Sequence, residues 1–582
     1  MTFRSRPAPK RSRSRSSSRR TFYTNLAFGA VVVFSLLILA VAAGVNWYGS
    51  HWLAVATVNG QSITKDDFAN RVDVDLWRLN EVESKIRDAA TAGLITNDQR
   101  DQEIATIAQE KSSPNTVYGA SLQSLIDSRL QAELAPQLGI TVTDAQVDAR
   151  LLKEASTNEQ RHAYLIEVAP DVVAPATTPT DAAIAAAQSK ADGYLARLTK
   201  GEAWTAVVKD SAPAQTDGDQ GYVSKESSTL DPAILNALFA LPANGVTAVV
   251  KGADGTFRIG RVTRIVAATV DTNYNQSIVN EGVSIDIYRQ AVRADVLRDA
   301  LKAKILADDT TVASVQRHVL EIQLTQETDP QTSQPILTDQ VDVRHILYAP
   351  GGAAAVGSPP PTNDPAWDAA KAKADATYQL LLKDPSKFAA IAKTDSADTS
   401  SGAQGGDIGY TSQATLDPAF GAAIFKAGLT KDQILPPVRS VYGWHVIQFI
   451  GRKSPAITRM NGFMADLAKP GADFGAIAKA NSEAADASKG GDMGWVAHHQ
   501  LSKTLEDEIF ALPVGSVSKL VVSGNTMYLF KVVEEQTRLP DKDQIATLTS
   551  TGFSNWFATE QGKATIDVDP AYAQYLTSTG GA

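Results

Sequence analysis

The sequence predicts an α+β protein with an N-terminal transmembrane helix, an all-α module, and three related small domains that each pack helices on an antiparallel sheet. Three observations support this prediction. An uncharged run follows a basic N-terminus, helical periodicity fills much of the next hundred residues, and a strand, helix, glycine-turn and strand pattern recurs along the chain. At 582 residues, the chain is too long for a single core and long enough for about four domains.

The composition excludes several classes of chemistry. The net charge of -9 is mild for this length, so the bulk of the chain is not expected to bind nucleic acid. There is no cysteine, which excludes disulfides, thiolate nucleophiles and cysteine metal sites. The only adjacent histidines, His498 and His499, would point to different faces of a strand or helix. We therefore expect no metal and no cofactor.

The N-terminus predicts a membrane anchor. Residues 1–25 form a basic tail with eight Lys and Arg residues and no acid, and an uncharged run at 26–48 follows. At about 1.5 Å per residue, that run can cross a bilayer as one helix. Trp47, Tyr48 and Trp52 stand at its far end, where an aromatic belt is expected. The basic tail should stay cytoplasmic, which gives a single-pass cell-membrane protein with its bulk outside the cytoplasm.

Two alternatives remain for this region. Ala40-Val-Ala42 could serve as the cleavage site of a signal peptide, although the apolar run is longer than a usual signal core. The Arg/Ser tail also resembles a nucleic-acid-binding arm. Beside a membrane span, the simpler interpretation of the tail is a determinant of topology.

The pattern of residues 53–158 predicts a helical module. Apolar residues recur at helical spacing through Leu122-Gln-Ser-Leu-Ile-Asp-Ser-Arg-Leu130, and Thr143 before Asp144 indicates a helix start. Two later segments also predict amphipathic helices, one within 269–314 (Asp286 to Ala307) and one within the C-terminal 539–582 (Thr551 to Ile566).

The middle copy of the repeat, residues 339–453, is the most complete. It contains a strand with His345, an Asp at 398, the turn Gly405-Gly-Asp-Ile-Gly-Tyr410, and a last strand with His445. The first copy, 159–268, matches the opening strand with Arg161-His-Ala-Tyr-Leu-Ile166, but it has no matching Asp and has Phe257 at the second histidine position. Asp407, Asp219 and Asp492 are expected to stabilise the glycine-rich turns of the three copies.

The third copy is expected to be split. Its glycine turn lies at Gly490–Trp495 and its last strand at Tyr528–Val532, but no opening strand precedes it at 456. Residues Arg317–Leu324 alternate as a strand should, so we expect 315–334 plus 456–538 to form one domain, with the middle copy inserted and its ends close together. The alternative is an extra edge strand on the middle copy. Ala484 falls near the Asp position of the third copy, and its last strand has no histidine.

Together, these motifs resemble the parvulin (rotamase, PpiC-type) prolyl isomerases. The phrases Val58-Asn-Gly-Gln-Ser-Ile-Thr64 and Leu125-Ile-Asp127, in this order and spacing, resemble the helical N-terminal module of SurA-, PpiD- and PrsA-type chaperones. That resemblance implies that the helical segment at 269–314 and the C-terminal helix pack on the module. His162 and His318 lack the other site residues and are interpreted as structural relics.

The resemblance also implies the site residues of the middle copy. His345 and His445 match the histidine pair that meets across the central strands, and Asp398 matches the position beside the prolyl carbonyl. The implied catalytic residues are His345, Asp398, Ser440 and His445, and the implied substrate-binding residues are Leu416 and Phe420. Ser440 stands where the family often has Thr. A lone strand histidine is more often a core residue, but two at this spacing with an Asp between them favour a site.

The sequence therefore predicts a membrane-anchored extracytoplasmic foldase that isomerises X-Pro bonds in unfolded, newly exported polypeptides. The loop at 349–364 has no Lys or Arg, so recognition of phosphorylated substrates is not expected. The alternative from another class is a non-catalytic holdase that uses all three copies as binding surfaces. No nucleic-acid partner is expected, and no oligomeric state is indicated.

Overall fold

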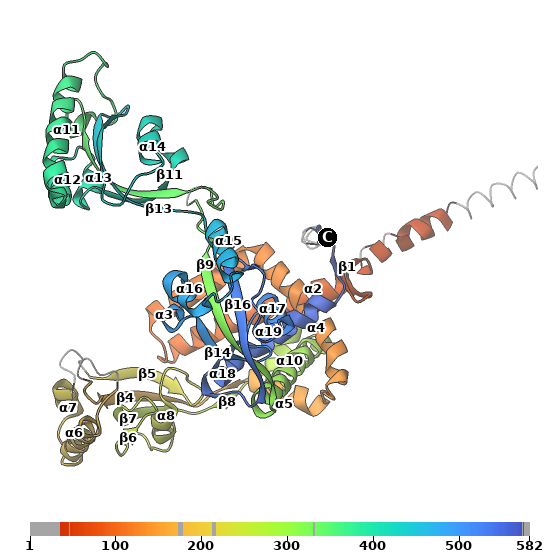
Figure 1. Cartoon of the computed structure of the whole chain (residues 1–582). Helices are drawn as coiled ribbons and strands as arrows, with labels where there is room; N and C mark the ends of the chain where they lie inside the picture. Colours follow the sequence, from red (N-terminus) through yellow and green to blue (C-terminus); the bar gives the residue numbers. More distant parts are fainter. Residues whose placement is uncertain are drawn as a thin grey trace, which may run out of the picture. The chain divides into compact units, whose positions relative to one another are not determined.

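The structure is a computed structural model that describes residues 35, 37–45, 47–49, 51–172, 178–211, 217–329, 332–572 and 574 (Figure 1). Two compact units are present, one comprising residues 1–304 and 560–582 and the other residues 305–559. Among the residues described, no helix is both long and apolar enough to cross a membrane. Of the predicted span at 26–48, the structure describes residues 35, 37–45, 47 and 48, and the basic tail at 1–25 lies outside the described residues.

The N-terminal module is mostly helical, as predicted. Threonines cap three of its helices through reciprocal capping boxes: Thr64 with Asp67, Thr96 with Gln99, and Thr143 with Gln146. The helix start predicted at Thr143 is confirmed. Its elements are β1 (Ala54–Val58), β2 (Gln61–Thr64), α2 (Lys65–Thr91), α3 (Asn97–Ser112), α4 (Pro114–Gln137) and α5 (Asp144–Glu154).

Two later segments pack on this module. Helix α10 (Ile285–Thr311), after α9 (Tyr274–Asn280), places Tyr288 against Trp77, with ring centroids 4.9 Å apart. The C-terminal strand β17 (Ile566–Val568) pairs with β1, and Gln561 donates a hydrogen bond to Asp127 (2.7 Å). Both contacts were expected from the resemblance. Between the third copy and β17 lie α18 (Lys542–Thr547), a π-helical turn (Leu548–Gly552) and α19 (Phe553–Lys563).

The first copy forms a sheet in the order β5-β4-β7-β6. Helices α6 and α7 pack on one face and α8 packs on the other, each with its own buried apolar cluster. Its elements are β3 (Ser156–Thr157), β4 (Gln160–Val168), α6 (Asp181–Thr199), α7 (Trp204–Ser211), β5 (Asp219–Ser224), α8 (Pro232–Phe239), β6 (Val250–Lys251), β7 (Phe257–Val266) and β8 (Thr269–Val270).

The middle copy has the same topology, with the strand order β11-β10-β13-β12. Figure 1 shows α11 and α12 along one side of this sheet and α14 on the other. Its elements are β10 (Gln340–Tyr348), α11 (Ala366–Lys383), α12 (Phe388–Asp395), α13 (Thr399–Ala403), β11 (Asp407–Ser412), α14 (Pro418–Ile424), β12 (Ile434–Arg439) and β13 (Trp444–Lys453), with short 3₁₀ turns at Ala353–Ala355, Pro385–Lys387 and Gln413–Thr415.

The third copy contains the strand that the sequence placed before the insertion. Strand β9 (Ser314–Thr325) lies between β14 and β16 in the order β14-β9-β16-β15, and Gln323 is opposite Tyr528. The predicted pairing is confirmed, and the alternative of an edge strand on the middle sheet is wrong. The other elements are α15 (Ala456–Leu467), α16 (Phe474–Asn481), a 3₁₀ turn (Ala487–Lys489), β14 (Asp492–Val496), α17 (Lys503–Ala511), β15 (Val521–Ser523) and β16 (Thr526–Arg538).

The inserted middle copy closes on itself. Gln340 and Lys453 are paired across β10 and β13, so the two ends of the segment are adjacent. The middle copy also has two buried apolar clusters made only of its own residues, between Val341 and Phe449. A segment with adjacent ends and its own core has the properties of an independently folding domain.

Candidate functional site

Two stacked histidines form the centre of the site in the middle copy. His345 on β10 and His445 on β13 are buried, with ring centroids 5.3 Å apart and planes 17° from parallel. Their Nδ1 atoms are 3.1 Å apart, which is a hydrogen-bond distance. The two strands are the central pair of the sheet, so backbone pairing on both sides fixes the positions of the rings.

A chain of hydrogen bonds continues from each ring. His345 Nε2 lies 2.9 Å from Asp398 Oδ2 and 2.9 Å from Ser401 Oγ. On the other side, His445 Nε2 lies 2.7 Å from Ser440 Oγ, which accepts a hydrogen bond from the backbone N–H of Tyr442 (3.0 Å). The four predicted catalytic residues are therefore brought together in one connected network.

The surroundings set the charges in this network. The hydrogen bond from His345 lowers the pKa of Asp398 well below its usual range, and bonds from Ser401 add to the effect. Burial, followed by the nearby His345, lowers the pKa of His445 to about 3. At neutral pH the site thus holds an ionised Asp398 and a neutral His445.

These charges fix the direction of the hydrogen bonds. A carboxylate only accepts, so His345 Nε2 carries a hydrogen and donates it to Asp398. When His345 is neutral, its Nδ1 accepts, so His445 donates from Nδ1 and accepts at Nε2 from the Ser440 hydroxyl. The chain of bonds then runs in one direction from Ser440 to Asp398. It holds each ring in one tautomer, with the hydrogen on Nε2 of His345 and on Nδ1 of His445.

Asp398 itself is fully engaged. As the residue before α13, it accepts hydrogen bonds at Oδ1 from the backbone N–H groups of Ser400 and Ser401 (3.1 and 3.4 Å). Its Oδ2 accepts from the Ser401 hydroxyl at 2.6 Å, besides His345. Because both oxygens already have partners, this carboxylate is suited to an electrostatic role, and a role as attacking nucleophile is not supported.

An apolar pocket opens beside the histidines. A cavity of about 430 Å³ is lined by the two predicted binding residues, Leu416 and Phe420, together with Ile408 and Tyr442. Phe420 stands edge-on to His445, with centroids 4.9 Å apart and an angle of 69°. The cavity is large enough for a prolyl ring, and the histidines and Asp398 lie in its wall.

Ser401 is a buried member of the network that the sequence did not single out. Its hydroxyl touches both Asp398 and His345. The available signal was its place three residues after Asp398, where a serine on a short helix more often has only a local capping role.

The glycine turn holds the site strand in register. The carbonyl of Gly406 accepts from the N–H of His345 (2.8 Å), and Gly406 has a φ of 86°. A Cβ at this glycine would lie 2.5 Å from the His345 carbonyl oxygen, so a larger residue cannot approach this closely. Asp407 accepts from the N–H of Gly409 (2.9 Å), which is the turn-stabilising role predicted for it, and Asp219 and Asp492 do the same in the other copies.

The same backbone bond identifies the true counterparts of His345. In the first copy the bond to the turn glycine comes from Leu165, and in the third copy it comes from Glu321. His162 and His318 lie three residues earlier, opposite Tyr222 and Trp495, and each bonds the Asp of its glycine turn. The prediction that His162 and His318 stand at the position of His345 is therefore wrong by three residues.

The counterparts of His445 also differ from expectation. In the middle copy His445 is opposite Leu347, two residues beyond His345. The equivalent residue of the first copy is Arg258, which pairs with Glu167 (2.6 Å), and the prediction of Phe257 is wrong by one residue. In the third copy Tyr528 takes this place, opposite Gln323.

The third copy has a pair of carboxyl groups where the middle copy has His345 and Ser401. Glu321 is 9% exposed, and burial together with the nearby Asp486 raises its pKa to about 7. One carboxyl oxygen of Asp486 is buried and finds no hydrogen-bond partner among the described residues. Across the described part of the chain, no group of three or more His, Asp or Glu residues could hold a metal ion. His498 and His499 bond different acids, Glu506 and Asp309.

Comparisons with known families agree with this organisation. The family described as the PPIC-type PPIASE domain matches residues 345–451 and 451–534, and a second family of the same description matches 142–273. The SurA-like N-terminal domain matches residues 19–161. The middle copy is thus a peptidyl-prolyl isomerase domain of the PpiC type.

Individual relatives cover less of the chain. The chaperone SurA of Yersinia pestis is 38% identical over 117 residues, which is 20% of this chain and 24% of that protein. The SurA of Pseudoalteromonas atlantica is 28% identical over 210 residues, 31% of this chain and 48% of that protein. The chain thus spans about a quarter to a half of the curated relatives it matches. Among solved structures, PrsA from Bacillus subtilis has 18% identity, 43% coverage of this chain, 91% of its own chain and a TM-score of 0.15.

Proposed function

Because this chain is a parvulin-type protein of the SurA- and PrsA-like chaperone group, we propose that it is a membrane-anchored foldase. It acts outside the cytoplasm and catalyses cis/trans isomerisation of X-Pro bonds in unfolded, newly exported polypeptides. One observation carries this proposal: the connected network of His345, His445, Asp398 and Ser440 beside an apolar pocket in the middle copy.

The network suits a reaction in which no covalent bond breaks. Rotation about an X-Pro bond is opposed by about 20 kcal/mol of amide resonance and takes tens of seconds or longer without a catalyst. A catalyst needs a grip on the prolyl ring and a dry surround that disfavours the planar, charge-separated amide. Leu416 and Phe420 supply the grip, and the buried histidines supply the dry wall.

Each polar residue has a proposed part in this step. The ionised carboxylate of Asp398 stands at the pocket wall, where it disfavours negative charge on the carbonyl oxygen of the residue before proline and so weakens the resonance of the X-Pro amide. His345 and His445 hold the geometry of the wall, and Ser440 fixes the tautomer of His445. Ser401 positions Asp398 from outside the pocket lining.

The substrates and location follow from the same proposal. The basic tail at 1–25 and the uncharged run at 26–48 support this location, with the bulk of the chain outside the cytoplasm and one helix as its anchor. The partners are then polypeptides that emerge unfolded from export. The loop at 349–364 lacks Lys and Arg, which supports substrates without phosphate.

A holdase without catalysis is the second candidate. Its support is that the first and third copies keep the fold while Leu165 and Glu321 replace the histidine of β10. A proline-isomerisation assay on residues 339–453 separates the two candidates. Catalysis by this segment supports the foldase, whereas an inactive segment from an equally inactive full chain supports the holdase.

A further inference from the structure

The pocket beside the histidines of the middle copy is acidic. The described residues that line it include two carboxylates, Asp398 and Asp417, and no Lys or Arg. Burial and the nearby His345 lower the pKa of His445. The negative charges of Asp417 and, more weakly, Asp398 oppose this lowering of the pKa, so both carboxylates act on the ring at the centre of the site. A cleft lined by one sign of charge attracts a ligand of the opposite sign.

Asp417 is held in place by three backbone groups. As the residue before α14, it accepts hydrogen bonds at Oδ1 from the N–H groups of Ala419 (2.9 Å) and Phe420 (3.1 Å). Its Oδ2 accepts from the N–H of Val441 (3.2 Å), in the turn between β12 and β13. Backbone N–H groups carry no net charge. They therefore orient this carboxylate without neutralising it.

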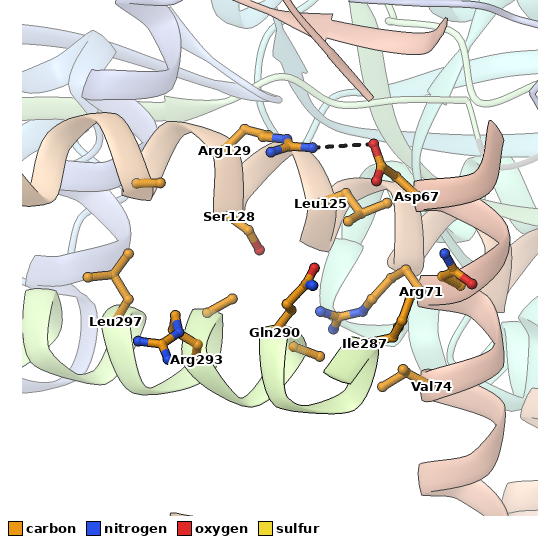
Figure 2. A pocket seen from close by; sticks show the side chains of 14 residues that line it. Asp67, Arg71, Val74, Leu125, Ser128, Arg129, Ile287, Gln290, Arg293 and Leu297 are labelled. Atoms are coloured by element: carbon orange, nitrogen blue, oxygen red, sulfur yellow. Dashed lines mark hydrogen bonds and ion pairs between the residues drawn. The ribbon is translucent and has the colours of Figure 1, made fainter. Parts of the chain in front are cut away.

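The cavity of the N-terminal helical module has a different balance of charge. Helices α2, α4 and α10 enclose about 320 Å³ there, and the lining includes three arginines (Figure 2). Each of these arginines already has a carboxylate partner: Arg71 pairs with Asp75, Arg129 with Asp67, and Arg293 with Asp144. Asp417 in the isomerase pocket, by contrast, has no Lys or Arg within ion-pair distance among the described residues.

The two carboxylates of the isomerase pocket serve different ends of the histidine pair. Asp398 bonds His345 (2.9 Å), whereas Asp417 bonds the turn that leads into the strand of His445. In the proposed reaction, Asp398 lies beside the carbonyl group before proline, and the apolar wall of the pocket holds the prolyl ring. The residue that follows proline then extends toward Asp417.

We propose that Asp417 selects substrates with a Lys or Arg residue directly after the proline. The cationic side chain meets the Asp417 carboxylate while the prolyl ring occupies the apolar part of the pocket. An acidic residue at the same place in the substrate is repelled by both carboxylates of the pocket, which adds to the discrimination. This inference rests on the proposed isomerase function and adds a substrate class to it.

The test compares substrates on the purified full-length chain. Peptides Ala-Ala-Pro-Xaa-Ala, blocked at both ends, carry Lys, Gln or Glu at Xaa, and their cis/trans exchange is followed by NMR of the peptide signals. At about 20 mM NaCl, where screening is weak, kcat/KM should be at least tenfold higher for Lys than for Glu, with Gln between them. Equal values for the Lys and Glu peptides would overturn the proposal. Lys placed before the proline should raise kcat/KM less than Lys after it, and the reverse order would contradict the assigned position.

Two matched variants locate the preference. Asp417→Asn removes the charge but keeps an oxygen that can cap α14, and it should lower the Lys/Glu ratio of kcat/KM at least threefold. Asp364→Asn makes the same change at another half-buried Asp of the middle copy, which bonds the N–H of Ala366 (2.8 Å) outside the pocket lining. This control should keep the ratio of the unchanged chain. Because the ratio does not depend on the amount of folded protein, a partly unfolded variant still gives a valid result, and equal ratios in the two variants would refute the role of Asp417.

Salt gives a measurement that needs no variant. In the unchanged chain the Lys/Glu ratio should fall at least twofold between about 20 and 500 mM NaCl, because salt screens partly exposed charges, and a constant ratio would contradict the proposal. Binding of fluorescein-labelled versions of the same peptides is measured by anisotropy. Turnover without a preference for Lys counts against this inference alone. Tighter binding of the Lys peptide without turnover counts against the isomerase alone.

Discussion

Replacing Glu321 by Gln should remove a pH-dependent loss of stability from the third copy. Glu321 occupies the strand position that His345 has in the middle copy, it is 9% exposed, and no hydrogen bond to its carboxyl group is found among the described residues. Burial and the nearby Asp486 raise its pKa from 4.5 to about 7. An uncharged amide of the same shape avoids the cost of ionising this group in the interior.

The magnitude follows from the change in proton affinity. Each tenfold change in proton affinity, or one pKa unit, is worth about 1.4 kcal/mol. Ionised Glu321 therefore lowers the free energy of unfolding by about 3 kcal/mol. The folded carboxyl binds its proton more tightly than the unfolded one. Between pH 4.5 and 7 the unfolded state therefore binds fewer protons, and stability falls as the pH rises through this window.

Hydrogen exchange of the β16 amides, corrected for intrinsic exchange, measures this effect between pH 5 and 8. At pH 8, the free energy of opening of these amides should be about 2–3 kcal/mol higher in Glu321→Gln than in the unchanged chain. At pH 5 the two should differ little. Glu534→Gln, at an exposed position of β16, is the control and should follow the unchanged chain. An unaltered pH slope in Glu321→Gln, or an equal gain in the control, would refute the reasoning.

Three further predictions concern the active site and the topology. Asp398→Ala and Phe420→Ala should each lower turnover of an Ala-Pro peptide at least tenfold, about 1.4 kcal/mol of barrier, and folded variants with full activity would refute the site. Because Phe420 is buried, its loss also leaves a cavity, so folding is checked by circular dichroism. Since the pKa of His445 is lowered to about 3, His445→Gln should reduce the rate without changing the shape of the pH–rate profile between pH 5 and 8; a changed shape would show that His445 titrates there. Protease added to intact cells should remove nearly everything beyond residue 50 and spare the basic tail, whereas release of a soluble form into the medium would indicate a cleaved signal peptide.

Much of the fold follows from patterns that are local in the sequence. Thr143 before a periodic segment predicted a helix start, and the alternation at Arg317–Leu324 predicted a strand without a domain of its own. The separation of that strand from its partners by about 200 residues was found because glycine turns and last strands recur in a fixed order. The same order of motifs also predicted that His345, Asp398 and His445 belong to one site.

The errors came from matching residue types without knowledge of backbone register. His162 and His318 resemble His345 in their neighbours, but the hydrogen bond to the turn glycine places Leu165 and Glu321 at its position. Strand irregularities next to these residues shift the pairing, and such bulges leave no clear mark in a single sequence. The burial of Glu321 and of one carboxyl oxygen of Asp486 could not be predicted because it depends on packing between distant segments.

The most direct test of the account is the rate of cis-to-trans isomerisation of an Ala-Pro peptide by residues 339–453 expressed alone. The segment has its own core and adjacent ends, so it can be measured without the rest of the chain. The account predicts catalysis that falls at least tenfold in Asp398→Ala. A folded segment and a full-length chain that both fail to accelerate the reaction would contradict the claim that the middle copy is the enzyme.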